Sequence, residues 1–159
     1  MVSEEKMSLT LDKYSYKPGE IIKGNIKINL EKPLKGRKLQ VALIGAVITT
    51  SKIDSCNHFD DHLHHHKEDD TFTVPEPFYN FTINLDGEKE YIDNEYAFEI
   101  KIPSDAIEKQ PRFEGWLKKA MDFSRLLGGH PPYVEWFVYS QLDVPWKIDI
   151  WKKQKIEIL

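Results

Sequence analysis

The sequence predicts an all-β antiparallel sandwich of about seven strands, with one amphipathic helix inserted before the C-terminal strands. Three observations predict it. Apolar and polar residues alternate along several segments, as in strands with one buried face. The segment 39–50 is apolar at nearly every position, which is typical of a central strand buried on both faces. Between two such segments, the apolar spacing changes to that of a helix.

Bulk properties limit the class of protein. The 159 residues suit one domain with its own core, and we treat 1–159 as a single domain. Apolar residues make up 40%, and no run reaches the ~18 apolar residues of a spanning helix, so no integral membrane segment is expected. Cys56 is the only cysteine, which excludes an internal disulfide and favours the cytoplasm, as does the lack of a signal-peptide pattern. The net charge of −4 argues against nucleic-acid binding.

The N-terminal half contains three expected strands. The first covers 8–12, where Met7, Leu9 and Leu11 alternate with polar residues, and the turn 17–20 follows it with Pro and Gly in type II positions. The second covers 22–31, where isoleucines alternate with Lys and Asn. The basic stretch 32–38 is the expected connection to the doubly apolar strand.

Four further strands are expected after the middle of the chain. The segment 71–85 contains Pro75 and Pro77, which confine it to an edge or a bulge because proline cannot donate to a ladder. The segment 95–102 alternates, with Tyr96, Phe98, Ile100 and Ile102 inward. The segments 133–142 and 148–158 form two strands around the corner at Pro145. In the first of them, one face consists of Val134, Trp136, Val138 and Leu142, and only Ser140 interrupts it. Asp143 and Asp149 are interpreted as corner and outer-face residues rather than as a paired acid site.

Residues 112–127 form the expected helix. Its apolar face includes Phe113, Trp116, Leu117 and Phe123, and Gly128-Gly129 ends it. The favoured interpretation is that this face covers the outer apolar surface of the sheet at Ile44, Ile48 and Phe137. The alternative is that it docks a partner or contacts a membrane peripherally.

Several motifs occur in an order that resembles the arrestin N-terminal domain. They are the turn and strand Tyr16–Gly24, Gly45 in the central strand, the strand Glu95–Pro103, and Leu142-Asp143-Val144-Pro145-Trp146 after an aromatic strand. The chain is also similar, more loosely, to the arrestin-like subunit of retromer and to bacterial sporulation-control proteins. The resemblance implies an arrestin-type, immunoglobulin-like sandwich. The helix departs from the family pattern because it follows the Tyr-x-Phe strand instead of preceding it.

The resemblance further implies a non-catalytic interaction or adaptor domain that binds another protein or peptide, as in trafficking or signalling. A cluster of basic residues could bind an acidic or phosphorylated peptide, and its alternative is a solvated charged face: Lys23, Lys27, Lys32, Lys35, Arg37 and Lys38. The buried arginine of the arrestin ionic core has no counterpart in 133–142. Strand addition at the Pro75–Pro77 edge is a second route of recognition. If the helix leaves the sheet uncovered, we expect homo-oligomers.

The segment 51–70 is expected to be a long loop with metal-ligand character. His58, His62, His64 and His66, together with Asp60 and Asp61, supply ligands for zinc or nickel, although their spacing matches no closed structural site. Adventitious metal binding with no true cofactor is the favoured interpretation. The alternative function is a metal-binding protein or a metal-dependent enzyme. We expect no enzyme, because the sequence lacks a glycine-rich phosphate loop, His-Glu-x-x-His and Gly-x-Ser-x-Gly.

Overall fold

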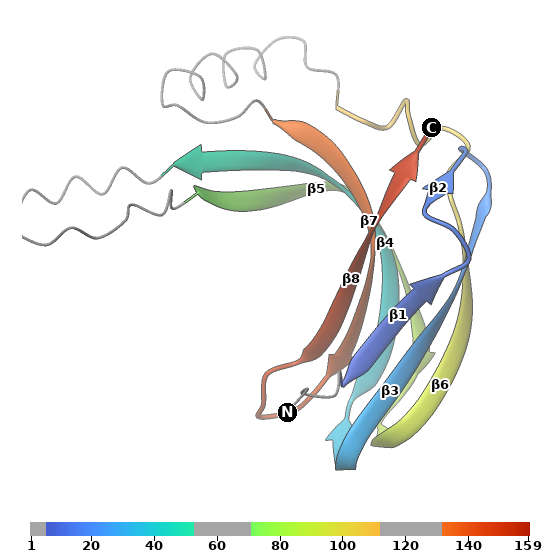
Figure 1. The fold of residues 1–159 in the computed structure, drawn as a ribbon, viewed down its shortest axis with the longest axis vertical. Helices are drawn as coiled ribbons and strands as arrows, with labels where there is room; N and C mark the ends of the chain where they lie inside the picture. The colour runs from blue at the N-terminus through green and yellow to red at the C-terminus, as the bar shows by residue number, and fades with distance from the viewer. Residues whose placement is uncertain (1–5, 53–70, 112–131) are drawn as a thin grey trace, which may run out of the picture.

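The structure, a computed structural model, describes residues 6–52, 71–111 and 132–159. The described residues form eight strands in two facing sheets (Figure 1). The strands are β1 (Met7–Leu11), β2 (Ser15–Tyr16), β3 (Ile21–Gly36), β4 (Lys38–Lys52), β5 (Thr71–Asp86), β6 (Lys89–Lys101), β7 (Tyr133–Asp143) and β8 (Ile150–Ile158).

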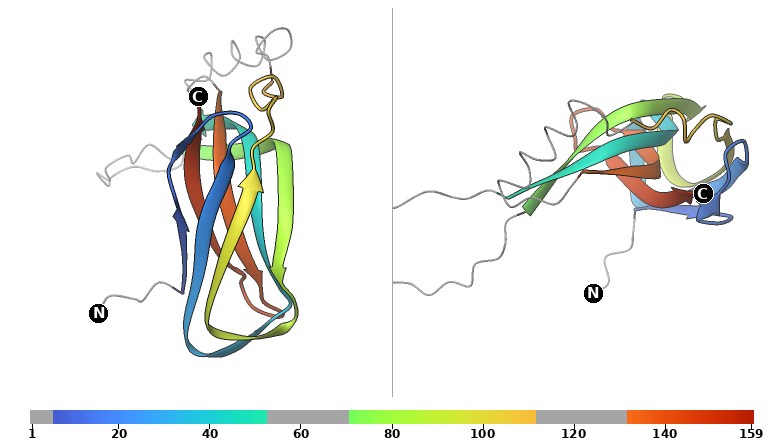
Figure 2. Two further views of the ribbon diagram at one scale, coloured as in Figure 1. Left: turned by 90° about the vertical axis from the view of Figure 1, so that its right-hand side faces the viewer. Right: turned by 90° about the horizontal axis from the view of Figure 1, so that it is seen from above.

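One sheet has three strands in the order β1-β3-β6, and the other has five in the order β2-β8-β7-β4-β5. All pairs are antiparallel except β2 with β8, which is parallel. Figure 2 shows that the segment 103–111 lies at the same end of the sandwich as the C-terminus, and that the loop between β7 and β8 lies at the opposite end.

The core fills the space between the sheets, because each strand turns its apolar residues inward. In β3, Ile22, Ile26 and Ile28 are fully buried, which confirms the alternation predicted for 22–31. In β6, the inward positions of Phe98 and Ile100 are confirmed in the same way. The other large core side chains come from β1, β2, β4, β6, β7 and β8: Met7, Leu11, Tyr16, Leu39, Val41, Leu43, Tyr91, Trp136, Val138, Leu142 and Ile156.

The central and edge positions predicted for two strands are also confirmed. β4 lies between β7 and β5, and it buries Val41 and Leu43 on its inner face and Ala46 and Ile48 on its outer face. β5 lies at the edge of the five-stranded sheet. Its register against β4 shifts between Gly45 and Ala46, opposite Pro77, so the proline-containing segment is both an edge and an irregularity.

The structure corrects two expectations and leaves one outside its range. β3 continues to Gly36, so the stretch 32–36 is strand with a register shift against β6 rather than a connection, and Arg37 alone separates β3 from β4. β2 was not predicted. The expected helix at 112–127 lies outside the described residues. No helix occurs within 6–52, 71–111 and 132–159, so none there could span a membrane.

Two turns owe their shape to specific residues. Gly19 has a φ of 85°, and the Glu20 N–H donates to the Lys17 carbonyl at 3.1 Å, so the predicted turn is present and needs glycine at that position. At the β5–β6 turn, the Asp86 carboxylate accepts hydrogen bonds from the Tyr96 hydroxyl (2.5 Å) and the Gly87 N–H (2.8 Å), and Lys89 Nζ lies 3.1 Å away.

The Asp86 cluster makes stability depend on pH. The hydrogen bond from Tyr96 is the main cause that lowers the pKa of Asp86 below its ordinary 3.8, followed by those from Gly87 and Lys89. A lowered folded-state pKa stabilises the protein above the unfolded pKa, and this stability is lost as the pH falls through the folded value. Asp86→Asn should therefore be less stable than the wild type at neutral pH, and the difference should shrink on acidification below about pH 4.

Urea denaturation at a series of pH values measures this effect. Tyr96→Phe removes the main donor, so it should also weaken the pH dependence. A stability difference between the wild type and Asp86→Asn that stays constant from neutral to strongly acidic pH would contradict the assignment.

Candidate functional site

β7 and β8 separate at one end of the sandwich and leave a fork in the five-stranded sheet. Their ladder runs from the pair of Leu142 with Ile150 to the pair of Trp136 with Ile156. The next pair along the two strands would be Glu135 with Glu157, and it is not formed. β7 instead continues along β4 to Tyr133, whereas the end of β8 pairs with β2. Figure 1 shows β7 staying beside β4 and β5 while β8 turns toward β2.

The backbone groups on the two arms of the fork point into it. The N–H groups of Glu157 and Leu159 donate to Tyr14 and Tyr16 at 2.8 and 2.9 Å, so they point toward β2. Because N–H directions alternate along a strand, those of Ile156 and Ile158 point toward β7. In β7, the backbone N–H and C=O groups of Trp136 point toward Ile156. Those of Val134, two residues earlier, point to the same side and therefore into the fork. Two strand edges therefore face each other without a ladder between them.

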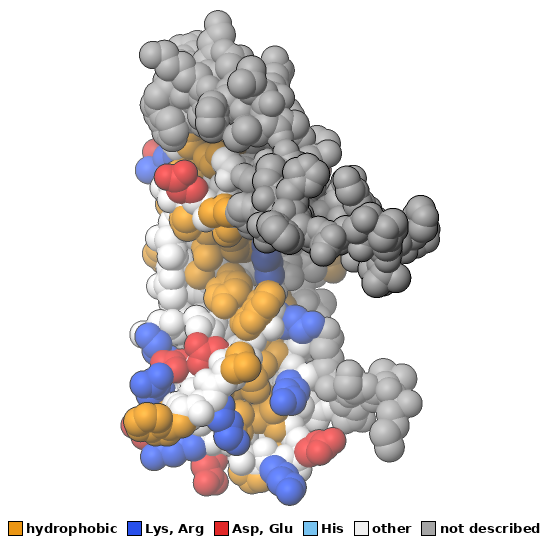
Figure 3. All heavy atoms as spheres, turned by 90° about the vertical axis from the view of Figure 1, so that its left-hand side faces the viewer, with side chains coloured by type: hydrophobic (Ala, Val, Ile, Leu, Met, Phe, Trp, Pro, Cys, Tyr) orange, Lys and Arg blue, Asp and Glu red, His pale blue; other side chains and the backbone are white. Residues whose placement is uncertain are grey.

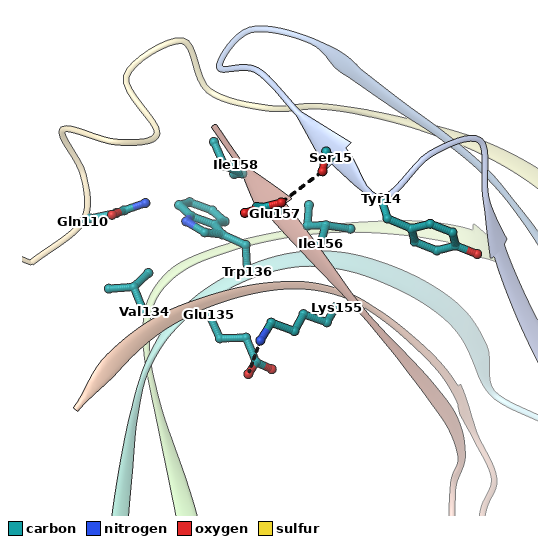
Figure 4. A pocket seen from close by; sticks show the side chains of 10 residues that line it. All are labelled: Tyr14, Ser15, Gln110, Val134, Glu135, Trp136, Lys155, Ile156, Glu157 and Ile158. Carbon is teal, nitrogen blue, oxygen red and sulfur yellow. Dashed lines mark hydrogen bonds and ion pairs between the residues drawn. The ribbon is translucent and has the colours of Figure 1, made fainter. Parts of the chain in front are cut away.

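A cavity of ≈ 590 Å³ occupies the fork, a volume within the range of ligand pockets. Its apolar wall consists of Val134, Trp136, Ile156 and Ile158. Its polar lining comes from β7, β8, the start of β2 and the segment after β6: Tyr14, Ser15, Gln110, Glu135, Lys155 and Glu157. Figure 4 shows the Gln110 side chain directed toward the nitrogen-bearing side of the Trp136 indole.

Trp136 lies where the fork meets the core, with an exposed fraction of 3%. Its ring packs edge-on against Phe78, with centroids 5.4 Å apart, and at a tilt against Tyr79 at 5.5 Å. Its Nε1 is buried and has no hydrogen-bond partner among the described residues. A buried donor without an acceptor is costly, so an acceptor on a ligand in the fork would be stabilising.

The two carboxylates that line the fork differ in their partners. Glu135 is buried and lies 2.9 Å from Lys153 Nζ and 3.8 Å from Lys155 Nζ, so two lysines compensate its charge. On the other arm, Glu157 accepts a hydrogen bond from Ser15 Oγ at 3.1 Å and forms no ion pair within the described part of the chain. The lysines that compensate Glu135 of β7 therefore lie on β8, and the carboxylate without an ion pair is that of Glu157, near the end of β8.

The outer face of the five-stranded sheet carries the apolar surface that the sequence predicts. Ala46, Ile48 and Phe137 are buried there, and Ile44 and Tyr139 pack against them. Figure 3 shows hydrophobic side chains in a band over this face, with basic side chains beside it. Lys153 Nζ lies 4.2 Å from the centroid of Phe137, and Tyr139 stacks on Trp151. The helix residues expected to cover this face, Phe113, Trp116, Leu117 and Phe123, lie outside the described residues.

The predicted basic cluster is divided among acidic partners along β3 and β4. Lys23 pairs with Glu99 at 3.8 Å, Lys35 with Glu88 at 3.2 Å, and Arg37 with Asp143 at 2.7 Å. Lys27 lies opposite Glu95 in the ladder. Lys32 and Lys38 are exposed. Acidic residues on neighbouring strands thus compensate most of the positive charge of the cluster, and the basic side chains do not gather at one point.

The predicted metal ligands His58, His62, His64 and His66 lie outside the described residues. Within 6–52, 71–111 and 132–159, no three His, Cys, Asp or Glu side chains are placed to hold a metal ion. Asp143 and Asp149 are corner residues, as interpreted from the sequence: Asp149 accepts hydrogen bonds from Gln141 Nε2 and the Val144 N–H.

The sequence did not indicate the fork. β2 has two residues, too few to show a period, and its pairing with β8 joins segments more than a hundred positions apart. The inward position of Trp136 was predicted, but a core position does not reveal that the neighbouring strand departs there.

Comparisons with known proteins agree with this fold. Residues 7–159 match the model of the family described as arrestin (or S-antigen), N-terminal domain. No curated protein matches the sequence. Among solved structures, the chain is similar to the sporulation control protein Spo0M from Bacillus subtilis, with 17% identity and a TM-score of 0.52. The match covers 96% of this chain and 48% of that one, so this chain spans about half the length of Spo0M. The family match extends over nearly the whole chain, and the protein belongs to the arrestin N-terminal domain family.

Proposed function

We propose that this arrestin-like domain is a non-catalytic protein-interaction module that binds an extended peptide in the fork between β7 and β8. The observation that carries the proposal is the divergence of the two strands after Trp136–Ile156, above a cavity of ≈ 590 Å³. Proteins commonly recognise peptides by adding a strand to an open sheet edge, where main-chain hydrogen bonds give affinity and side-chain pockets give specificity.

The lining of the fork favours a particular kind of peptide. A residue that points to the inner side would meet Val134 and the Trp136 indole, so we expect an apolar or small side chain with an acceptor for Nε1. A residue that points outward at β8 would meet Glu157, so we expect Lys or Arg there.

The fork is a better candidate than the β5 edge that the sequence suggested. β5 is an edge strand, but Pro75 and Pro77 lack the N–H groups that strand addition requires. The carboxylates of the fork also favour binding over catalysis, because Glu135 is held by two lysines and Glu157 by Ser15. This arrangement resembles that of a charged rim more than that of a general base.

The test uses random linear peptides displayed on phage, selected against the full chain and then measured as free peptides by titration calorimetry. Val134→Pro removes one N–H that faces the fork and leaves the hydrogen bonds of β7 to β4 in place. We expect selected peptides to bind Val134→Pro about tenfold more weakly, the effect of about one lost hydrogen bond.

Glu99→Pro is the matched control. Ile102 donates its N–H to Glu20, so the N–H of Glu99 points to the free edge of β6 in the other sheet. This variant should bind selected peptides as the wild type does. Loss of binding in Glu99→Pro with normal binding in Val134→Pro would move recognition to β6 and refute the fork.

A further inference from the structure

The loop between β7 and β8 presents two large apolar side chains to water. Trp146 has an exposed fraction of 103% and Ile148 of 90%. Trp146 also has a φ of 62°, a left-handed conformation that is rare for a bulky residue. Neither packing nor backbone preference explains a tryptophan at this position, and such outliers concentrate at functional sites.

The loop is held firmly at its base. Asp149 accepts a hydrogen bond from the Val144 N–H at 2.9 Å and another from Gln141 Nε2 at 2.6 Å. The Val144 side chain is buried in the core. Trp146 and Ile148 therefore project from a fixed corner.

A groove of ≈ 710 Å³ lies beside the loop, between it and the distal part of β3. Its apolar lining includes Leu30, Leu34 and Ile150. Its charged lining consists of three lysines and one glutamate: Lys6, Lys32, Lys147 and Glu31. None of these lysines forms an ion pair with any residue that the structure describes, so the lining of the groove carries more positive than negative charge.

We propose that this end of the sandwich, which we call the loop end, docks on the surface of an anionic lipid bilayer. The loop end comprises Trp146, Lys147, Ile148 and the adjacent groove. Tryptophan prefers the headgroup region because its ring is amphipathic, and lysines beside it attract anionic headgroups while their stems lie along apolar surface. Ile148 and the groove add apolar area to the contact. The combination of a protruding apolar tip with surrounding lysines favours lipid over an acidic protein, which would not require Trp146 in water.

The loop end is separate from the fork. Val134 lies near the start of β7 and Val144 directly follows its end. At the rise per residue of an extended strand, these ten residues span roughly 33 Å. The left view of Figure 2 places the loop and the C-terminus at opposite ends of the sandwich. Peptide binding and lipid docking can therefore be tested independently.

The test is sedimentation of the full chain with sucrose-loaded vesicles of phosphatidylcholine, alone or mixed with phosphatidylglycerol. We expect binding to the mixed vesicles that weakens as salt is raised. Trp146→Ser with Ile148→Ser should reduce the affinity about tenfold or more, because the apolar burial is lost. Lys147→Ala should reduce it about fivefold, the effect of one cation near an anionic surface.

Two controls separate docking from unfolding and from the fork. Ile107→Ser changes a side chain that is 49% exposed at the opposite end, and its vesicle binding should match the wild type. Val134→Pro should also bind vesicles normally. Trp146→Gly removes the strained backbone, so it should be at least as thermally stable as the wild type and still bind vesicles weakly.

Three outcomes would overturn the proposal. The first is no binding of the wild type to the mixed vesicles. The second is equal binding to both vesicle compositions. The third is normal vesicle binding by the Trp146→Ser, Ile148→Ser variant, which would place any lipid contact elsewhere.

Discussion

Trp136→Ala should lower the free energy of unfolding by about 3–5 kcal/mol, the usual cost of removing a buried tryptophan. Trp136 has an exposed fraction of 3% and packs against Phe78 and Tyr79 at centroid distances of 5.4 and 5.5 Å. It also closes the core at the point where β8 leaves β7. The cavity left by alanine would open toward the fork, because none of the described strands covers that side.

Urea denaturation of the wild type, Trp136→Ala and Trp151→Ala measures this cost. Trp151 is the matched control, because it has an exposed fraction of 55% and touches Tyr139 from the outer face. Its replacement should cost less than about 1.5 kcal/mol. If Trp136→Ala and Trp151→Ala cost the same, the core position of Trp136 is wrong.

Trp136→Phe separates packing from hydrogen bonding. The indole Nε1 is buried without a partner among the described residues, and a buried unpaired donor costs about 1–3 kcal/mol. Phenylalanine removes that unpaired donor, and this gain partly offsets the packing lost with its smaller side chain. Trp136→Phe should therefore lower the free energy of unfolding much less than Trp136→Ala does. The same variant should weaken the binding of selected peptides, because the proposed acceptor contact is lost. A cost for phenylalanine as large as that for alanine would show that Nε1 has a partner.

Gly45→Ala should destabilise the protein by about 1–3 kcal/mol, the usual cost of overpacking a core. A Cβ atom at Gly45 would lie 2.8 Å from Phe78 Cζ and 2.9 Å from Trp136 Cζ3. Both distances are shorter than carbon atoms tolerate, and the two rings already pack against each other. The strand can therefore accept alanine only if an aromatic ring moves.

Gly87→Ala is the matched control for Gly45→Ala, since a Cβ atom at Gly87 would meet no atom within 4 Å. Its thermal unfolding should stay close to that of the wild type. Combining Gly45→Ala with Phe78→Leu should cost less than the sum of the two single changes, because the smaller side chain leaves room for the new methyl group. Strict additivity would mean that the close approach to Phe78 does not cause the destabilisation.

The core-facing residues of the sandwich were predictable because each strand carries its own period of two. The alternation in β3 and β7 identified which side chains face inward, down to the interruption at Ser140, which is buried. The two apolar faces of β4 identified it as the central strand, and the prolines of β5 identified an edge. In each case the signal lies within one segment and does not depend on its neighbours.

The candidate sites were less predictable, because they depend on which segments meet. Lys23, Lys35 and Arg37 form a basic cluster in the sequence, but the fold places Glu99, Glu88 and Asp143 beside them. The exposure of Trp146 could not be read from its motif either, since a tryptophan after proline at a corner is equally compatible with burial.

The sequence alone determined the sandwich, its family, the faces of its long strands and the edge position of the proline-containing strand. Only the tertiary structure decided where the sheet divides. β8 leaves β7 after Ile156 because its last residues pair in parallel with Ser15 and Tyr16 of β2. Two residues have no detectable period, and a parallel pairing across almost the whole chain leaves no local signal. The fork exists because β8 cannot remain beside β7 while its end pairs with β2.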